Sequence, residues 1–300
     1  MTRAQTIVDR LVAIVEEDGF DAHAVHVLID DETAAFYWSD DVRRDVHSVA
    51  KGVCVIAAGI AADEGLLDID APVAIHLQDF ALGDGVDAVT VRHLLNMTSG
   101  IDLPWSETLM TDWPDLAREF LSRPSRGRVF QYSNASTYAA MRVLEAVVGD
   151  VPLWLNSRVF GPLGIEEPEW ERCPNGYIVA GGGLHLSATE MARIGRLIRD
   201  DGMWQSQRLV SSQSVQAMHS DWFTRPQVEG NEIAPPYRRY ALAGWGGPGD
   251  AWRLHGAYGQ LLIFLGDAVV TITANDHFKA DRMAERAVET LEQYVSIRRE

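Results

Sequence analysis

The sequence predicts an α/β (α+β) protein in which an antiparallel sheet is flanked by helices and carries a largely helical insert. Short β-rich runs occur near both ends of the 300-residue chain, whereas the long stretch between them has helical patterns and few strands. Such an order implies that the two chain ends join in one sheet. We therefore expect residues 1–67 and 186–300 to form an α/β subdomain and residues 68–185 a helical subdomain, with the functional site between them.

The N-terminal part of the chain predicts a helix, a β-hairpin and a second helix. Residues 1–19 alternate charged with aliphatic side chains as an amphipathic helix does, which does not resemble a signal peptide. Residues 24–29 and 34–38 are β-rich runs separated by an acidic turn. An apolar helix then begins at Ser48 and ends at Gly65.

The remaining elements follow from the same periodicities. Helical patterns occur at residues 91–96, 113–121, 136–148 and 187–200. Strand patterns occur at residues 240–245, 260–265 and 268–274, with a hairpin turn at Gly266 and Asp267. A last amphipathic helix is expected at residues 280–297.

Composition limits the possible partners. The net charge of −17 repels nucleic acid and anionic membrane, and 47% apolar residues suffice for a large core. The longest apolar run, residues 53–62, is much shorter than the roughly 20 residues that cross a bilayer. Two cysteines, Cys54 and Cys173, do not indicate a structural disulfide. We expect a cytoplasmic protein with no metal, no cofactor and a small molecule as its partner.

Lysine usage singles out one position for chemistry. Only two of the 26 basic residues are lysines, and Lys51 follows Ser48 by three positions at the start of an apolar helix. An arginine stays protonated in proteins, whereas burial can bring a lysine amine to its neutral form. Ser48 could simply cap the helix, but a capping box has Glu or Gln three residues later. The pair suits a serine nucleophile with an amine base, near a backbone N–H that stabilises an oxyanion.

Two other segments carry side chains that could act with this pair. Tyr132 could relay a proton and Asn134 could orient the lysine or a substrate carbonyl, although Asn134 could also simply cap a helix. Residues 255–259, His-Gly-Ala-Tyr-Gly, read as a small-residue strand segment that a ligand can approach closely, or as a bend.

Taken together, in this order, the three segments resemble the active-site motifs of the serine β-lactamase and penicillin-binding protein superfamily. The resemblance is closest to its class C-like branch of esterases, D-amino-acid peptidases and amide hydrolases. It covers residues 43 to 275, and its most specific piece is the leucine-rich run at residues 90–101 that ends in Thr-Ser-Gly-Ile. It implies a β-lactamase-like fold.

The resemblance also implies a role for each matching residue. Ser48 looks like the acyl-accepting nucleophile and Lys51 like its general base. Tyr132 resembles the proton relay to the leaving group. Asn134 is similar to the residue that binds a substrate amide and holds the lysine.

The third motif departs from the family pattern. His255 stands where many members have the lysine of Lys-Thr-Gly, so the cationic anchor for a substrate carboxylate is replaced by a histidine that is mostly neutral at pH 7. Gly256 and Ala257 follow, and the backbone N–H groups of Ser48 and Tyr258 would form the oxyanion hole. This change disfavours a true β-lactamase.

The sequence thus predicts a serine hydrolase, esterase-like, that acts on a small ester or amide through a Ser48 acyl-enzyme. Three alternatives stay open: an acyltransferase that uses the same intermediate, a β-lactamase or D-amino-acid peptidase, and a non-catalytic ligand-binding relative. The retained Ser48, Lys51 and Tyr132 argue against the last. Pocket walls are expected from loops 103–111 and 222–237 and from tryptophans, namely Trp105, Trp222, Trp245 and Trp252.

Overall fold

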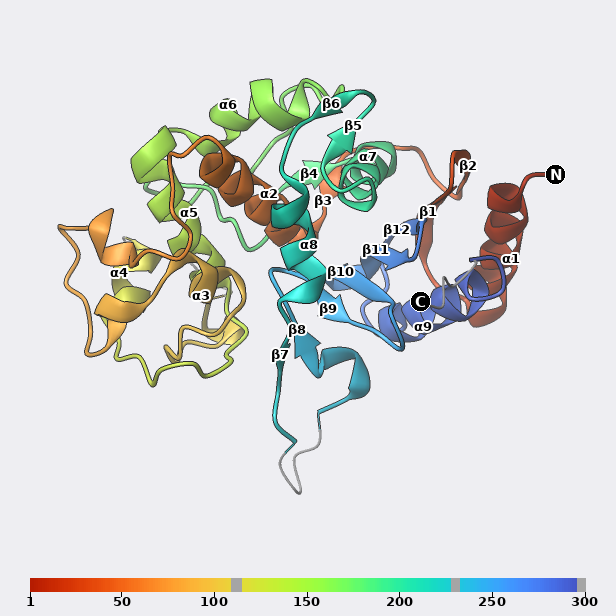
Figure 1. The fold of residues 1–300 in the computed structure, drawn as a ribbon. Coiled ribbons are helices and arrows are strands. Elements are labelled where there is room, and N and C mark those ends of the chain that lie inside the picture. The colour runs from red at the N-terminus through yellow and green to blue at the C-terminus, as the bar shows by residue number, and fades with distance from the viewer. Residues whose placement is uncertain (109–114, 228–232, 296–300) are drawn as a thin grey trace.

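An antiparallel sheet built from both ends of the chain organises the protein (Figure 1). The computed structural model describes residues 1–108, 115–227 and 233–295. Within the described residues, the main sheet has eight strands in the order β2-β1-β12-β11-β10-β9-β8-β7. Their bounds are β1 (Ala22–Ile29), β2 (Glu32–Tyr37), β7 (Phe223–Thr224), β8 (Arg239–Tyr240), β9 (Trp245–Gly246), β10 (Trp252–Gly256), β11 (Gln260–Leu265) and β12 (Ala268–Ala274). The predicted mixed fold is confirmed, because β1 from one chain end pairs with β12 from the other.

In the described residues, two short two-stranded antiparallel sheets lie outside the main one. They pair β3 (Arg44–Asp45) with β4 (His185–Leu186) and β5 (Met203–Trp204) with β6 (Gln207–Arg208). The first of these joins the segment just before Ser48 to the segment just after residues 180–183. Across the described residues, none of the helices combines the length and the apolar character that a membrane span needs.

One face of the sheet packs against the two terminal helices, α1 (Arg3–Asp18) and α9 (Ala280–Leu291) (Figure 1). The side chain of Thr2 caps the start of α1 by accepting from the Gln5 N–H, and Gly19 ends it in the left-handed conformation. Apolar side chains of both helices and of β1, β11 and β12 form one core on this face. The predicted amphipathic N-terminal helix is thus part of the fold.

The other face packs against α2 (Ala50–Asp63), α7 (Ala188–Arg199) and α8 (Ser212–Ser220). Because both faces are covered, every residue of β11 and β12 is buried, which explains their continuous apolar runs. Close approach of α2 to β10 requires Gly52, since a Cβ there would collide with the Leu254 side chain. Helix α2 therefore lies in the core and directly against the sheet.

The chain between α2 and β4 is mainly helical, as the sequence predicts. Its helices are α3 (Val91–Leu95), α4 (Leu116–Leu121), α5 (Asn134–Val148) and α6 (Val151–Leu155). Helix α5 packs on α2, α3 and α4 in the same core as the sheet face that carries α2. Residues 113–114 of the helix predicted at 113–121 lie outside the described residues.

Three boundaries in the C-terminal half of the chain differ from the sequence prediction. Residues 240–245 are not one strand: β8 ends at Tyr240, the chain turns with Ala243 at φ 62°, and β9 begins at Trp245, which pairs with Tyr240. The turn is buried and made of small apolar residues, so it lacks the polar residues that usually mark turns. The strand expected across residues 255–259 ends at Gly256, and the last helix ends at Leu291.

Candidate active site

Ser48 lies in a 3₁₀ turn, His47–Val49, that leads into α2. The expectation that Ser48 begins the α-helix is wrong by two residues, because α2 begins at Ala50. The Ser48 hydroxyl makes no capping hydrogen bond and instead accepts one from Lys51 Nζ at 2.9 Å. The structure therefore favours the chemical interpretation of this serine over the capping one.

The turn before Ser48 is held by a carboxylate that the sequence analysis did not identify. His47 has a left-handed backbone (φ 49°), which is strained for a residue with a side chain. Asp45 accepts from the N–H groups of His47 at 2.7 Å and Gly183 at 2.8 Å, and its carboxylate lies 3.0 Å from His47 Nδ1. Although burial opposes ionisation, the hydrogen bonds from His47 and Gly183 keep the pKa of Asp45 below its ordinary value. Asp45 thus fixes the turn that presents Ser48.

Lys51 is buried, at 2% exposure, and its amine has three oxygen neighbours. Nζ lies 2.9 Å from Ser48 Oγ, 2.9 Å from Asn134 Oδ1 and 2.7 Å from the Gly181 carbonyl. Within the described residues, no carboxylate lies within 4.0 Å of it. An ammonium can donate to all three oxygens. A neutral amine would donate to Asn134 Oδ1 and the Gly181 carbonyl oxygen, which can only accept, and turn its lone pair toward the Ser48 hydroxyl.

Asn134 reaches this cluster from the first turn of α5. The N-cap is Ser133, so the alternative that Asn134 caps the helix is wrong. Its Oδ1 accepts from Lys51, while its Nδ2 donates to none of the residues that the structure describes. Gly181 packs so closely that a Cβ there would lie 2.7 Å from Asn134 Oδ1. The sequence analysis did not assign Gly181 to the site, because this residue acts through its backbone carbonyl.

Tyr132 lies beside the amine, in the loop that precedes α5. Its ring centroid is 5.1 Å from Lys51 Nζ, and its ring packs 5.3 Å from that of Trp245. The loop is tied down where the Gln131 N–H donates to the Met97 carbonyl at 2.9 Å. The leucine-rich run at residues 90–101 therefore holds the loop that carries Tyr132.

The end of β10 closes the site on the side of the Ser48 turn. A Cβ at Gly256 would collide with the Val46 carbonyl, so only glycine lets the strand approach so closely. Ala257 to Gly259 form a 3₁₀ turn in which Tyr258 has a left-handed backbone (φ 57°), and its ring lies 5.2 Å from that of His47. Gly256 and the ring of Tyr258 thus pack against the turn that carries Ser48.

His255 is held in its neutral form. Burial, assisted by the positive charge of Arg253, lowers the pKa of His255 to about 4, although Asp281 opposes this shift. The Asp281 carboxylate is 3.7 Å from His255 Nδ1 and is itself bound by Arg253 at 2.5 Å and by the Tyr237 hydroxyl at 2.8 Å. At pH 7 this position therefore carries no positive charge.

Four of the predicted site residues, Ser48, Tyr132, His255 and Ala257, line a pocket of about 510 Å³. Its described lining is Ser48, Pro104, Phe130, Gln131, Tyr132, Arg225, Tyr237, Trp245, His255, Ala257 and His277. Of the four tryptophans expected here, Trp245 is present. Trp252 instead stacks on Phe264 in the core, Trp222 packs under Arg239, and the side chain of Trp105 lies outside the described part. Parts of the expected wall loops, residues 109–111 and 228–232, also lie outside it.

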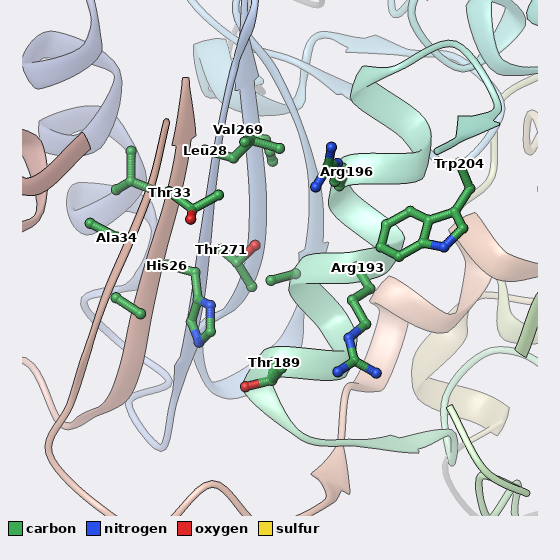
Figure 2. Close-up of a pocket in the computed structure, with 13 residues that line it drawn as sticks. His26, Leu28, Thr33, Ala34, Thr189, Arg193, Arg196, Trp204, Val269 and Thr271 are labelled. Atoms are coloured by element: carbon green, nitrogen blue, oxygen red, sulfur yellow. The ribbon is translucent and has the colours of Figure 1, made fainter. Parts of the chain in front are cut away.

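A second pocket of about 460 Å³ lies between α7 and strands β1, β2 and β12 (Figure 2). Its described lining includes no serine, cysteine or lysine. Both of its arginines are already engaged: Arg193 donates to the carbonyls of Leu163 and Gly164, and Arg196 pairs with Asp200. None of the predicted site residues is in this described lining, whereas Ser48, Tyr132 and His255 line the first pocket.

Comparison with known proteins agrees with this geometry. The sequence matches the Beta-lactamase family over residues 7–294. A curated relative, the 6-aminohexanoate-dimer hydrolase of Paenarthrobacter ureafaciens, is 28% identical over 247 residues. That match covers 68% of this chain and 61% of the relative, so the chain spans less than two thirds of the relative's length.

Solved structures share the fold at low sequence identity. A class C beta-lactamase superimposes with a TM-score of 0.76 at 13% identity, with 98% of each chain covered. The D-amino acid amidase from Ochrobactrum anthropi SV3 superimposes with a TM-score of 0.73 at 14% identity, covering 98% of this chain and 100% of the amidase. The match therefore extends over almost the whole chain.

Proposed function

The chain belongs to the beta-lactamase family of serine hydrolases, and on this premise we propose that it cleaves a small ester or amide through an acyl-enzyme on Ser48. The observation that carries the proposal is the 2.9 Å contact between Lys51 Nζ and Ser48 Oγ, inside a buried cluster whose other two oxygens can only accept. Such a cluster suits proton transfer from the serine to the amine.

The proposed reaction has two halves. Ser48 Oγ attacks the substrate carbonyl while Lys51 takes the hydroxyl proton, and the N–H groups of Ser48 and Tyr258 bind the oxyanion. Tyr132 passes its proton to the leaving oxygen or nitrogen and is reprotonated from Lys51, and the bond from that atom to the carbonyl carbon breaks to leave the Ser48 acyl ester. A water then attacks this ester and gives its proton back through the same groups, so that the acid leaves and Ser48 regains its hydrogen.

Hydrolysis of simple esters or linear amides is preferred over hydrolysis of β-lactams. The family position that often supplies a cationic anchor is held here by His255, whose pKa is lowered to about 4 by burial. The curated relative is by name a hydrolase of a 6-aminohexanoate dimer, which supports an amide as the natural substrate class. An acyltransferase would use the same groups and differ only in the acceptor that replaces water.

Turnover of a p-nitrophenyl ester and of a matched anilide by wild type and Ser48→Ala tests the proposal. We expect nitrophenol and nitroaniline release from the wild type, at least 1000-fold reduced in the variant. Ser206→Ala, which changes an exposed serine, is the control and should match the wild type. Added amines or alcohols report acyl transfer through new ester or amide products. A folded wild type that releases neither product, with or without acceptors, would support the non-catalytic alternative.

Two further features belong to this proposal. We place the site between an α/β subdomain of residues 1–67 and 186–300 and a helical subdomain of residues 68–185, since Ser48 comes from the first and Asn134 from the second. We also place the reaction in the cytoplasm, which the free thiols of Cys54 and Cys173 support.

A further inference from the structure

Three aromatic side chains continue from the active-site pocket onto the surface of the protein. His277 lines the pocket together with Ser48, and the centroid of its ring lies 5.4 Å from that of Tyr258 and 5.3 Å from that of Phe278. Tyr258 is 45% exposed and Phe278 is 92% exposed. A single exposed phenylalanine is ordinary, but this one extends a row of rings that begins inside the pocket of the reacting serine. We call Tyr258, His277 and Phe278 the aromatic rim.

Backbone hydrogen bonds hold the loop that carries Phe278. The Asp276 N–H donates to the Tyr258 carbonyl at 3.1 Å, which ties this loop to the turn that follows β10. The Asp276 carboxylate accepts from the N–H groups of Phe278 at 3.1 Å and Lys279 at 3.0 Å. A group that is already held in position loses less conformational freedom when it binds a ligand. The aromatic rim is therefore a preformed surface.

The wall from which the aromatic rim begins assigns it to one half of the substrate. In the proposed reaction the leaving group faces Tyr132, whose ring packs against Trp245 in a separate aromatic cluster. Ala257 and His277 belong to a different wall of the pocket, next to the turn that packs against Ser48. The acyl half of a substrate lies across the breaking bond from the leaving group. We therefore place the acyl half on the wall that continues into the aromatic rim.

We propose that the aromatic rim binds an apolar acyl chain, so that the preferred substrates are esters or amides of medium-chain aliphatic acids. The inference rests on the proposed function for the direction of cleavage. A chain that passes His277 and lies on Phe278 removes apolar surface of both the chain and the exposed ring from water, which is favourable in proportion to the area buried. An acetyl group is too short to leave the pocket and gains nothing from this contact.

Two esters with the same leaving group and different acyl chains test the proposal. The probes are p-nitrophenyl acetate and p-nitrophenyl octanoate, the latter below the concentration at which it aggregates. We expect Phe278→Ala to lower the ratio of kcat/KM for the octanoate to kcat/KM for the acetate by about 5- to 20-fold. Phe278→Leu keeps an apolar side chain and should keep part of the ratio. Phe36→Ala removes the same side chain from an exposed position on β2, with three strands between β2 and β10, and should leave the ratio unchanged.

A second pair of esters checks which half of the substrate lies on the aromatic rim. Octyl acetate and ethyl acetate share the acyl group and differ in the leaving alcohol, so Phe278→Ala should leave the ratio of their kcat/KM values unchanged. A fall in this ratio in place of the octanoate-to-acetate ratio would put the chain on the leaving-group side and overturn the proposal. A wild type that sediments as a dimer and a Phe278→Ala variant that sediments as a monomer, with both ratios unchanged, would assign the ring to a contact between two copies of the chain.

Binding separates this inference from the proposed function. Calorimetric titration of octanamide into Ser48→Ala should show binding that is weakened about 5- to 20-fold in Ser48→Ala/Phe278→Ala. If no ester is turned over but this difference holds, the acyl-chain site stands and the hydrolase proposal falls. If the esters are turned over and Phe278→Ala leaves the octanoate-to-acetate ratio unchanged, the acyl-chain site is refuted while the hydrolase proposal stands. Octanamide binding that does not depend on Phe278, in a folded protein that turns over no ester, would refute both.

Discussion

Two substitutions of Asn134 would show whether Lys51 has to give up a proton during the reaction. Asn134→Ala removes the acceptor that lies 2.9 Å from Lys51 Nζ. A hydrogen bond to a charged group contributes about 1.5–3 kcal/mol, so kcat/KM for a p-nitrophenyl ester should fall by about 10- to 150-fold. Asn134→Asp keeps an oxygen in the same place but makes it negative, which favours the protonated amine.

The aspartate variant should therefore be slower than the alanine variant at pH 7, although it restores the hydrogen bond. A neighbouring opposite charge favours the charged form of a group by roughly 1 to 3 pH units, so the acidic limb of the pH–rate profile should move up by that amount. The difference in kcat/KM between the two variants should become small toward pH 10, where the amine is neutral in a larger fraction of both. Both variants lack the Nδ2 donor, so the loss of any hydrogen bond from that group to substrate is common to the two.

The assay is kcat/KM from pH 5 to 10 for wild type and both variants, with thermal unfolding as the control for folding. The aspartate variant should unfold no earlier than the alanine variant, because a negative charge in the first turn of α5 is favourable. An aspartate variant as active as the alanine variant or more active at pH 7, with the same pH profile, would refute a role for neutral Lys51.

Three other substitutions probe the rest of the site. Tyr132→Phe should lower kcat/KM for an anilide about 10- to 100-fold more than for a p-nitrophenyl ester, because the nitrophenolate leaves without a proton; equal losses would contradict a proton relay. Gly181→Ala should reduce ester hydrolysis at least as much as Asn134→Ala, because the added Cβ would lie 2.7 Å from Asn134 Oδ1. Full activity in a folded Gly181→Ala variant would show that this contact is unimportant. Burial lowers the pKa of His255 to about 4 in the folded state, so the unfolded chain binds the proton more readily and stability falls as the pH drops from about 6.5 toward 4. Denaturant titrations at pH 7 and pH 4 give the loss in free energy of unfolding between the two pH values, and His255→Gln should make this loss smaller by about 3 kcal/mol. The same loss in the variant as in the wild type would contradict the burial argument.

The sequence predicted the regular elements where one physical signal dominates. Residues 260–265 and 268–274 are continuous apolar runs on either side of a Gly-Asp turn, and the structure has strands β11 and β12 at these bounds. The turn between β8 and β9 was missed because it is buried and made of small apolar residues, which resemble a strand in sequence. The pattern of burial alone does not distinguish the two conformations.

The site likewise contains residues that the sequence predicted and residues that it did not. Ser48, Lys51, Tyr132 and Asn134 were found because their side chains carry chemistry and match a motif, and the structure brings them into one cluster. Gly181 contributes a carbonyl, and any residue type has one.

The most direct test of the account is the intact mass of the protein after brief exposure to a fluorophosphonate, followed by peptide mapping. The account predicts one adduct, on Ser48, that is absent from Ser48→Ala, present in Ser206→Ala, and greatly slowed in Lys51→Met, which keeps an unbranched side chain, one atom shorter, but has no amine. An adduct on another serine, or no adduct on a folded wild-type sample, would contradict the central claim that the Lys51 cluster activates Ser48.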